Sequence, residues 1–234
     1  MMLTPDLQRP PLSRAVAWRE VGLAVVVLWS VLGGACFFLG AQSIYDRWGT
    51  SLNATLVLDV VFLIGCLAVI GFVFWRQRRQ GEGIVELGWG RPVRMPVIVI
   101  AVVYGLAWTT MSYMRGGDPL AFPWQRPIMM AIGLVLAFAE EIAVRGLILD
   151  RLARCGTSRI IQIVVTAGIM AVYHGVVGHS VWPSYMVSSF VLFGVLSVIY
   201  VYGGRSLTPV YIAHAMAHFL GDPALMQGVL YGVG

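Results

Sequence analysis

The sequence has little charge and no lysine. Only 12% of its 234 residues are charged and 59% are hydrophobic, whereas an ordinary soluble domain carries about 25% charged and about 45–50% apolar residues. At half the usual charge, the chain has too few polar side chains to cover a core in water. The composition therefore excludes a soluble globule, a disordered chain and a protein that binds nucleic acid, and it leaves a polytopic membrane protein.

Cysteine is also scarce, and the chain has neither an internal repeat nor a low-complexity tract. The three cysteines are Cys36, Cys66 and Cys155, an odd number placed within apolar runs or beside an arginine-rich segment. This placement argues against a disulfide framework and favours the interpretation that they are small buried residues. Residues 1–234 are accordingly predicted to form a single integral-membrane domain.

Seven apolar runs approach the length of about 20 residues that a helix needs to cross the hydrocarbon core of a bilayer. Backbone groups in lipid must be satisfied within their own segment, so each run is predicted to be helical. The last run is interrupted by Gly221-Asp222-Pro223. The prediction is an all-α, polytopic transmembrane helix bundle of seven spans, or eight if the last run divides. The runs are Val21–Gln42, Leu52–Trp75, Met95–Met114, Ile128–Leu149, Ile160–Val177, Tyr185–Tyr202 and Pro209–Val229.

The sixteen basic residues are all arginines, and their distribution predicts the topology. If the N-terminus is cytoplasmic, twelve arginines fall in inner segments and three in outer segments, while Arg145 lies within a span. Such an excess of positive charge is typical of cytoplasmic segments. We therefore predict an integral protein of the plasma (inner) membrane with a cytoplasmic N-terminus, and we attribute the net charge of +5 to topology rather than to nucleic-acid binding.

Seven ionisable side chains lie within the apolar runs, where each is costly. A charge near the bilayer centre costs at least about 2.5–3.5 kcal/mol on insertion scales, so residues of this kind usually have a function. Asp59 stands alone in its run, and we expect it to hydrogen-bond to a neighbouring helix. His179 falls in a predicted outer loop and is expected to be interfacial. The other six are candidates for a functional site: Glu140, Glu141, Arg145, His174, His214 and His218.

The two adjacent glutamates are predicted to have different roles. Neighbouring residues on a helix point about 100° apart, so Glu140 and Glu141 face different surroundings. Glu141 and Arg145 are spaced i, i+4 and share a face, with the glutamate on the favourable N-terminal side. We expect these two to form an ion pair. Glu140 has no such local partner, which makes it the candidate general base.

The three histidines come from two further runs. His214 and His218 are also spaced i, i+4 and therefore share a helix face, as in helical zinc sites. The same arrangement would serve equally well to orient a water molecule or to stabilise an oxyanion. Together with His174 and the glutamates, they predict a hydrolytic centre in which Glu140 activates water, with or without a metal ion.

At these three motifs the chain resembles the CPBP family, the intramembrane proteases related to the type II CAAX prenyl protease and the bacterial Abi proteins. The family's pattern is Glu-Glu-x-x-x-Arg, then Phe-x-x-x-His, then His-x-x-x-Asn or a related residue. Residues 140–145 match the first motif in full. The second motif has His174 but Met170 at the Phe position, and the third has His214 but His218 in place of Asn.

This resemblance covers roughly residues 128–222, which hold the catalytic core motifs. It implies an endopeptidase that hydrolyses a peptide bond of a membrane-associated protein or peptide, in or beside the membrane. The resemblance implies that Glu140 is the general base and that Glu141 supports it. It implies that His174 and His214 bind the water, a metal or the oxyanion, and that His218 is a further polar residue of the site.

The cofactor and the partners follow from the same set of residues. If a metal is bound, the candidate is a divalent ion such as Zn²⁺ on His174, His214 and His218, since imidazole is a better zinc ligand than an amide. The expected partners are the lipid bilayer and a membrane-associated protein or peptide substrate, with no nucleic acid. The substrate's identity and the oligomeric state stay open.

Two functions other than proteolysis fit these residues. Because a fold does not determine a function, a non-enzymatic immunity or scaffold protein would use the bundle to hold another membrane protein. A proton-linked transporter would use the glutamates and histidines as a proton relay, although the internal repeat common in transporters is absent.

Overall fold

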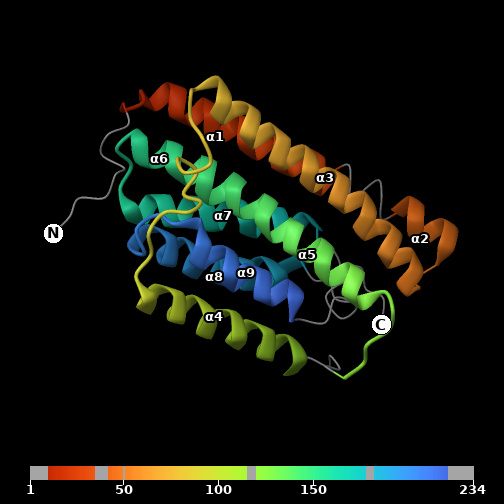
Figure 1. Ribbon diagram of the computed structural model, residues 1–234. Helices are drawn as coiled ribbons and strands as arrows, with labels where there is room; N and C mark the ends of the chain where they lie inside the picture. Colours follow the sequence, from red (N-terminus) through yellow and green to blue (C-terminus); the bar gives the residue numbers. More distant parts are fainter. Residues whose placement is uncertain (1–9, 35–41, 50, 115–119, 178–181, 221–234) are drawn as a thin grey trace.

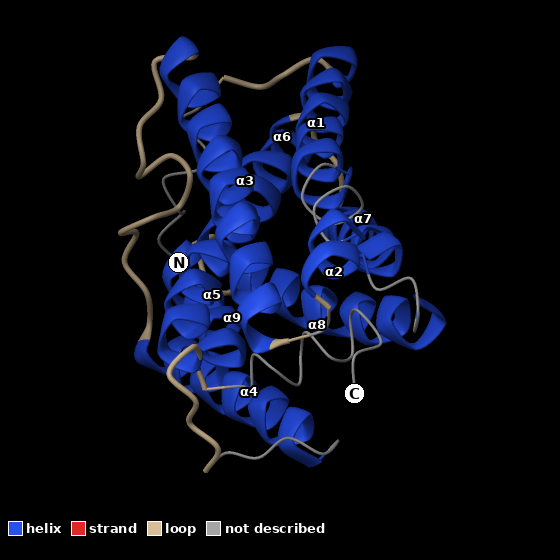
Figure 2. Cartoon of the chain, turned by 90° about the vertical axis from the view of Figure 1, so that its right-hand side faces the viewer, coloured by secondary structure: helices blue, strands red, loops and turns tan. Residues whose placement is uncertain are grey.

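The computed structural model describes residues 10–34, 42–49, 51–114, 120–177 and 182–220. The regular structure within these ranges is entirely helical (Figure 2), which confirms the predicted all-α class. In chain order the elements are α1 (Arg14–Leu28), α2 (Gln42–Trp48), α3 (Leu52–Arg79), α4 (Met95–Met114), α5 (Arg126–Glu141), the π-helix η3 (Ile142–Leu149), α6 (Asp150–Arg154), α7 (Arg159–Val177), α8 (Trp182–Tyr202) and α9 (Leu207–Phe219).

Four helical segments in the described residues are long and apolar enough to cross a membrane, and two shorter apolar helices accompany them. This supports the prediction of an integral membrane protein, whereas the number of seven or eight spans stays a prediction. The proposed break at 221–223 lies outside the described residues. The four segments are Arg14–Gly34, Leu52–Arg79, Arg126–Arg154 and Pro183–Tyr202, and the shorter helices are Met95–Met111 and Arg159–Gly175.

Several helices extend beyond the apolar runs that predicted them. α1 begins at Arg14 rather than Val21, because the Ser13 side chain caps it by accepting a hydrogen bond from the Val16 amide at 3.4 Å. α3 continues past its predicted end to Arg79. Hydropathy marks only the lipid-facing part of a helix, while caps and arginine-rich turns carry it into the interface.

The chain segment α5–η3–α6 lies at the centre of the bundle (Figure 1). α3 packs against α5, and α1 packs against η3 and α6. α7 and α8 pack extensively on each other, and α9 packs between α5 and α4. The central segment therefore touches most of the other helices, which explains why all eight residues of η3 are buried.

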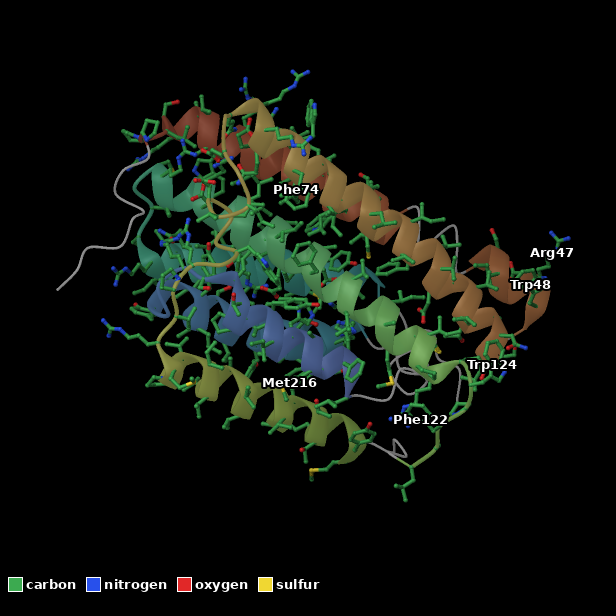
Figure 3. All side chains as sticks on the ribbon, viewed as in Figure 1. Arg47, Trp48, Phe74, Phe122, Trp124 and Met216 are labelled. Atoms are coloured by element: carbon green, nitrogen blue, oxygen red, sulfur yellow. The ribbon has the colours of Figure 1, made fainter. Side chains whose placement is uncertain are left out.

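The arginine-rich ends of the helices meet at one end of the bundle. Arg76 at the end of α3 forms an ion pair with Glu20 of α1, and Arg154 of α6 forms one with Glu82 at 2.6 Å. Arg47 lies at the opposite end of the bundle, with α2 (Figure 3). The separation agrees with the predicted sorting of arginines, and the orientation with a cytoplasmic N-terminus stays a prediction.

Two glycines allow α9 to approach its neighbours closely. A Cβ atom on Gly133 of α5 would lie 2.7 Å from the Cβ of His218, and a Cβ on Gly105 of α4 would lie 2.9 Å from the Ala213 carbonyl oxygen. Small residues at such crossings let helix backbones pack tightly in membranes. These contacts hold the histidine face of α9 against α5.

The loop between α3 and α4 closes the arginine-rich end of the central helices. Leu87 is fully buried against Gly146 of η3, where an added Cβ would lie 3.0 Å from the leucine Cδ2. Trp89 packs edge-on against Phe138 and Tyr211, with ring centroids 5.2 and 5.4 Å away. This loop therefore ties α5, η3 and α9 together on one side of the candidate site.

Candidate active site

The ion pair predicted between Glu141 and Arg145 is present and is inaccessible to solvent. Arg145 Nη1 donates to Glu141 Oε1 at 2.9 Å, and the two side chains are 0% and 1% exposed. Arg145 Nη2 donates to the Phe193 carbonyl oxygen at 2.8 Å and to Ser197 Oγ at 3.4 Å, both on α8. The guanidinium also lies over the Phe193 ring, 5.0 Å from its centroid. The pair therefore fixes the carboxylate of Glu141 relative to α8.

A change of helix type occurs between the glutamates and the arginine. α5 ends at Glu141 and the chain continues without a break as the π-helix η3. π-helical turns are rare and occur frequently at functional sites, because they rotate the following side chains relative to those of an α-helix. Here the turn leaves Arg145 bonded to Glu141 while Glu140 faces a different set of residues.

His214 joins this ion pair from α9. Its Nδ1 lies 2.9 Å from Glu141 Oε1, and because a carboxylate oxygen accepts, this nitrogen carries the hydrogen and donates it. Its Nε2 faces Glu140 Oε2 at 3.7 Å and His218 Nε2 at 3.2 Å. With His214 neutral, the Nε2–H of His218 donates to the Nε2 of His214. Glu141 and His218 thus hold the His214 ring from both sides.

Glu140 is the carboxylate that takes no part in the ion pair between Glu141 and Arg145. It is 2% exposed, and its Oε2 has no hydrogen-bond partner among the described residues. The Tyr173 side chain of α7 lies close to the same carboxylate. As the helix geometry predicts, the two glutamates have different neighbours: Glu141 bonds to an arginine and a histidine, while Glu140 keeps a buried acceptor for another group.

His174 approaches from α7, and its tautomer follows from its contact. Its Nδ1 donates to the Met170 carbonyl oxygen at 2.9 Å, so its Nε2 is an acceptor. The ring packs on Phe193, with centroids 4.9 Å apart, and edge-on against Tyr173 at 4.8 Å. Met170, which stands at the family's Phe position, is fully buried. The aromatic packing around His174 therefore comes from Phe193 and Tyr173.

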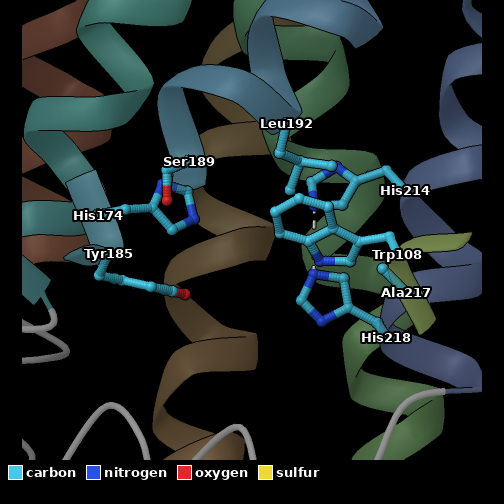
Figure 4. Close-up of a pocket in the computed structure, with 8 residues that line it drawn as sticks. All are labelled: Trp108, His174, Tyr185, Ser189, Leu192, His214, Ala217 and His218. Atoms are coloured by element: carbon cyan, nitrogen blue, oxygen red, sulfur yellow. Dashed lines mark hydrogen bonds between the residues drawn. The ribbon is translucent and has the colours of Figure 1, made fainter. Parts of the chain in front are cut away.

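A small chamber lies between the histidines (Figure 4). The space open to the centre of a water molecule is about 40 Å³, and one water needs roughly 10–15 Å³ on this measure. The chamber has room for a few water molecules but none for a peptide backbone in this closed form. Figure 4 shows His174, Tyr185 and Ser189 on one side and His214, His218 and Trp108 on the other, and Leu192 and Ala217 complete the lining.

The histidines fit a metal ion only in part. The Nε2 atoms of His214 and His218 are 3.2 Å apart, close to the roughly 3.3 Å expected between two imidazole ligands on one tetrahedral zinc. His174 lies across the chamber from them. Within the described ranges, no group of three or more His, Cys, Asp or Glu residues is arranged to hold a metal. A divalent metal therefore stays a prediction, with the α9 pair as its best-placed ligands.

Of the six candidate residues, the three histidines line the chamber, whereas Glu140, Glu141 and Arg145 lie behind them and do not line it. Asp59 is buried within α3 and is absent from the chamber lining. His179 lies outside the described residues. Conversely, Trp108, Tyr185 and Ser189 line the chamber but were not predicted, because aromatic and hydroxyl side chains are ordinary in membrane helices. The one signal in the sequence is the i, i+4 spacing of Tyr185 and Ser189, which predicts that they share one face of α8.

Comparison with known proteins supports the resemblance drawn from the motifs. Residues 122–220 match the family model described as Rce1-like, type II CAAX prenyl endopeptidase Rce1-like. This range contains every residue of the cluster around Glu140 and leaves out the first three long helices. No curated protein and no solved structure matches the chain.

Proposed function

Because residues 122–220 match the family model of the Rce1-like type II CAAX prenyl endopeptidases, we propose that the chain is an intramembrane endopeptidase whose general base is Glu140. The observation that carries the proposal is the Oε2 of Glu140, which is buried without a hydrogen-bond partner among the described residues and lies 3.7 Å from the Nε2 of His214. His214 in turn lines the water-sized chamber. A buried acceptor of this kind needs a partner. A water molecule provides that partner.

The geometry supports a water-mediated hydrolysis. Glu140 takes a proton from the water as the water oxygen bonds to the carbonyl carbon of the scissile peptide bond, and the carbonyl oxygen becomes negatively charged. The C–N bond then breaks, and the Glu140 carboxylic acid returns the proton to the departing amine. Atoms and charge balance, and Glu140 ends as it began.

The neighbouring residues position this water. His174 presents Nε2 as an acceptor, since its Nδ1–H is bound to the Met170 carbonyl, and can orient one water hydrogen. Glu141, held by Arg145, fixes His214 through its Nδ1–H. His218 holds the other side of the same ring. A divalent metal bound to the two α9 histidines would supply a Lewis acid for the same carbonyl.

The substrate we propose is a membrane-associated peptide, with a prenylated CAAX peptide as the first candidate because the family description names it. The test uses purified protein in lipid nanodiscs with a panel of fluorescent membrane peptides, half farnesylated at a C-terminal CAAX sequence and half unmodified. The wild type should release a defined product, identified by mass spectrometry. Preference within the panel assigns the substrate class.

Two variants make this test specific. Glu140→Gln keeps the side-chain volume but removes the base, and it should lower kcat by about 10²–10⁴-fold, the typical contribution of a general base. Asp59→Asn removes another buried membrane carboxyl, one on α3 rather than on the central segment that carries Glu140, and should retain full activity. Equal cleavage by Glu140→Gln and wild type would reject Glu140 as the general base, whereas no cleavage by wild type would favour the scaffold function.

A further inference from the structure

The proposed mechanism leaves two hydroxyl groups of the chamber without a role. Tyr185 and Ser189 of α8 both line it, and their i, i+4 spacing places them on one face of that helix. Neither hydroxyl is hydrogen-bonded to any residue in the described ranges, although buried hydroxyl groups normally have partners. Both therefore have a hydrogen to donate to whatever occupies the chamber.

Tyr185 is oriented for such a contact. Its ring packs against the His174 ring at 66°, with the centroids 5.4 Å apart. Its hydroxyl points across the chamber toward the pair of α9 histidines (Figure 4). It also interacts electrostatically with the Glu140 carboxylate. The phenol thus faces the chamber from the side opposite His214, the lining residue that lies next to Glu140.

The negative oxygen formed during hydrolysis needs a hydrogen-bond donor, and the nearby N–H groups are engaged elsewhere. The Nδ1–H of His174 binds a backbone carbonyl, and that of His214 binds Glu141. Arg145 directs Nη1 to Glu141 and Nη2 to α8. The Nε2–H of His218 is shared with His214. Among these groups, the hydroxyls of α8 are the donors left for the substrate.

We propose that Tyr185 is a further catalytic residue, whose O–H donates a hydrogen bond to the carbonyl oxygen of the scissile peptide bond. The inference rests on the proposed peptidase function and deepens it. As the water oxygen bonds to the carbonyl carbon, the π electrons of the C=O bond move to the oxygen, and the phenol stabilises that charge without giving up its proton. Such a donor matters most in the transition state.

The experiment compares three proteins in the same nanodiscs, with the peptide that the wild type cleaves. Tyr185→Phe keeps the ring against His174 and removes only the donor. It should lower kcat by about 10²–10³-fold, as for the loss of one oxyanion donor, with KM within about twofold. Tyr202→Phe makes the same change near the other end of α8, where the side chain is 61% exposed, and should match wild type.

A binding measurement separates a catalytic role from a structural one. A phosphinate analogue of the cleaved peptide mimics the tetrahedral oxyanion, and an N-methylated, uncleavable analogue mimics the bound ground state. Tyr185→Phe should lose affinity for the phosphinate by about the same factor as kcat/KM and bind the N-methyl analogue as wild type does.

Three results would overturn the inference or its basis. A kcat of Tyr185→Phe within about threefold of wild type, or an equal loss of affinity for both analogues, contradicts the role of Tyr185. If Glu140→Gln is inactive while Tyr185→Phe is not, the proposed function survives and only the donor assignment fails. If wild type cleaves no peptide of the panel, the proposed function itself has failed.

Discussion

Two arginines in this protein are completely buried, and their surroundings differ in charge balance. Arg145 lies in the middle of the membrane domain and Arg151 near its arginine-rich end, and both are 0% exposed. Arg151 donates to Asp150 at 2.6 Å, to Gln77 at 2.9 Å and to Glu82 at 3.3–3.4 Å. Each arginine is paired, but only one of the two clusters is neutral.

The cluster around Arg151 matches each positive charge with a negative one. Arg154 joins it by pairing with Glu82 at 2.6 Å and with Asp150 at 3.8 Å, so two guanidinium groups face two carboxylates. The contacts join the end of α3, the following loop and α6. A balanced cluster of this kind recovers part of the cost of burying charge and has no group left over for chemistry.

The cluster around Arg145 contains one carboxylate too many. Arg145 balances Glu141, and Glu140 keeps an oxygen without a partner among the described residues. An unbalanced buried carboxylate is costly, and functional sites are where such costs are tolerated. The comparison teaches that full burial and ion pairing are common to both arginine clusters, whereas an acceptor without a partner among the described residues occurs in the cluster that we propose as the active site.

The largest expected effect comes from removing either arginine. Arg145→Met and Arg151→Met each remove a buried positive charge and leave the remaining buried carboxylates in excess, which destabilises by about 3–5 kcal/mol. Only Arg145→Met should also lower the specific activity of the folded fraction, by about 10²-fold or more, because Glu141 then loses its hold on His214. Thermal unfolding in detergent, with activity normalised to folded protein, measures both. Equal specific activities would show that the two clusters are both structural.

A smaller effect is expected at His218, the position where the chain departs from the family pattern. His218→Ala removes the partner of His214 Nε2, and loss of a buried hydrogen bond costs about 1–3 kcal/mol, or roughly 5–150-fold in kcat. His218→Asn restores an N–H donor and should recover most of this activity. Steady-state kinetics of the two variants is the measurement, and an inactive asparagine variant would point to a metal ligand instead.

The smallest effects on stability are expected when a single carboxylate charge is removed from each cluster. Glu82→Gln breaks a balanced set of ion pairs and should lower stability by about 1.5–3 kcal/mol with kcat unchanged. Glu140→Gln removes an unbalanced charge and should leave the melting temperature equal or higher, while activity is lost. Thermal melts of the two variants, measured side by side with wild type, test this difference in stability. A lower melting temperature for Glu140→Gln would mean that Glu140 is part of a stabilising pair.

Local spacing predicted part of the site correctly. The i, i+4 rule predicted the Glu141–Arg145 pair and the shared face of His214 and His218, since both depend on the geometry of one helical segment. The same reasoning separated Glu140 from Glu141. It did not predict the π-helix that follows Glu141, because no short sequence signal distinguishes a π turn from an α turn before its neighbours are known.

Contacts between helices could not be predicted from the sequence. The bond from His214 to Glu141 depends on how closely α9 approaches α5, which Gly133 permits through its contact with His218. The position of Tyr185 depends on the packing of α8 against α7. Tyrosines are common in membrane helices, so the residue type alone does not predict a place in the site. α9 begins at Leu207, two residues before the predicted run, and the part of that run after Leu220 lies outside the described residues.

The sequence by itself determined that this is a helical membrane protein with costly ionisable groups on three segments, because composition, run length and i, i+4 spacing act locally along the chain. Only the tertiary structure decided which of those groups meet. The offset and rotation of packed helices set the 2.9 Å contact between His214 and Glu141 and left Glu140 with an open acceptor. These quantities depend on packing between distant segments, and no local pattern encodes them.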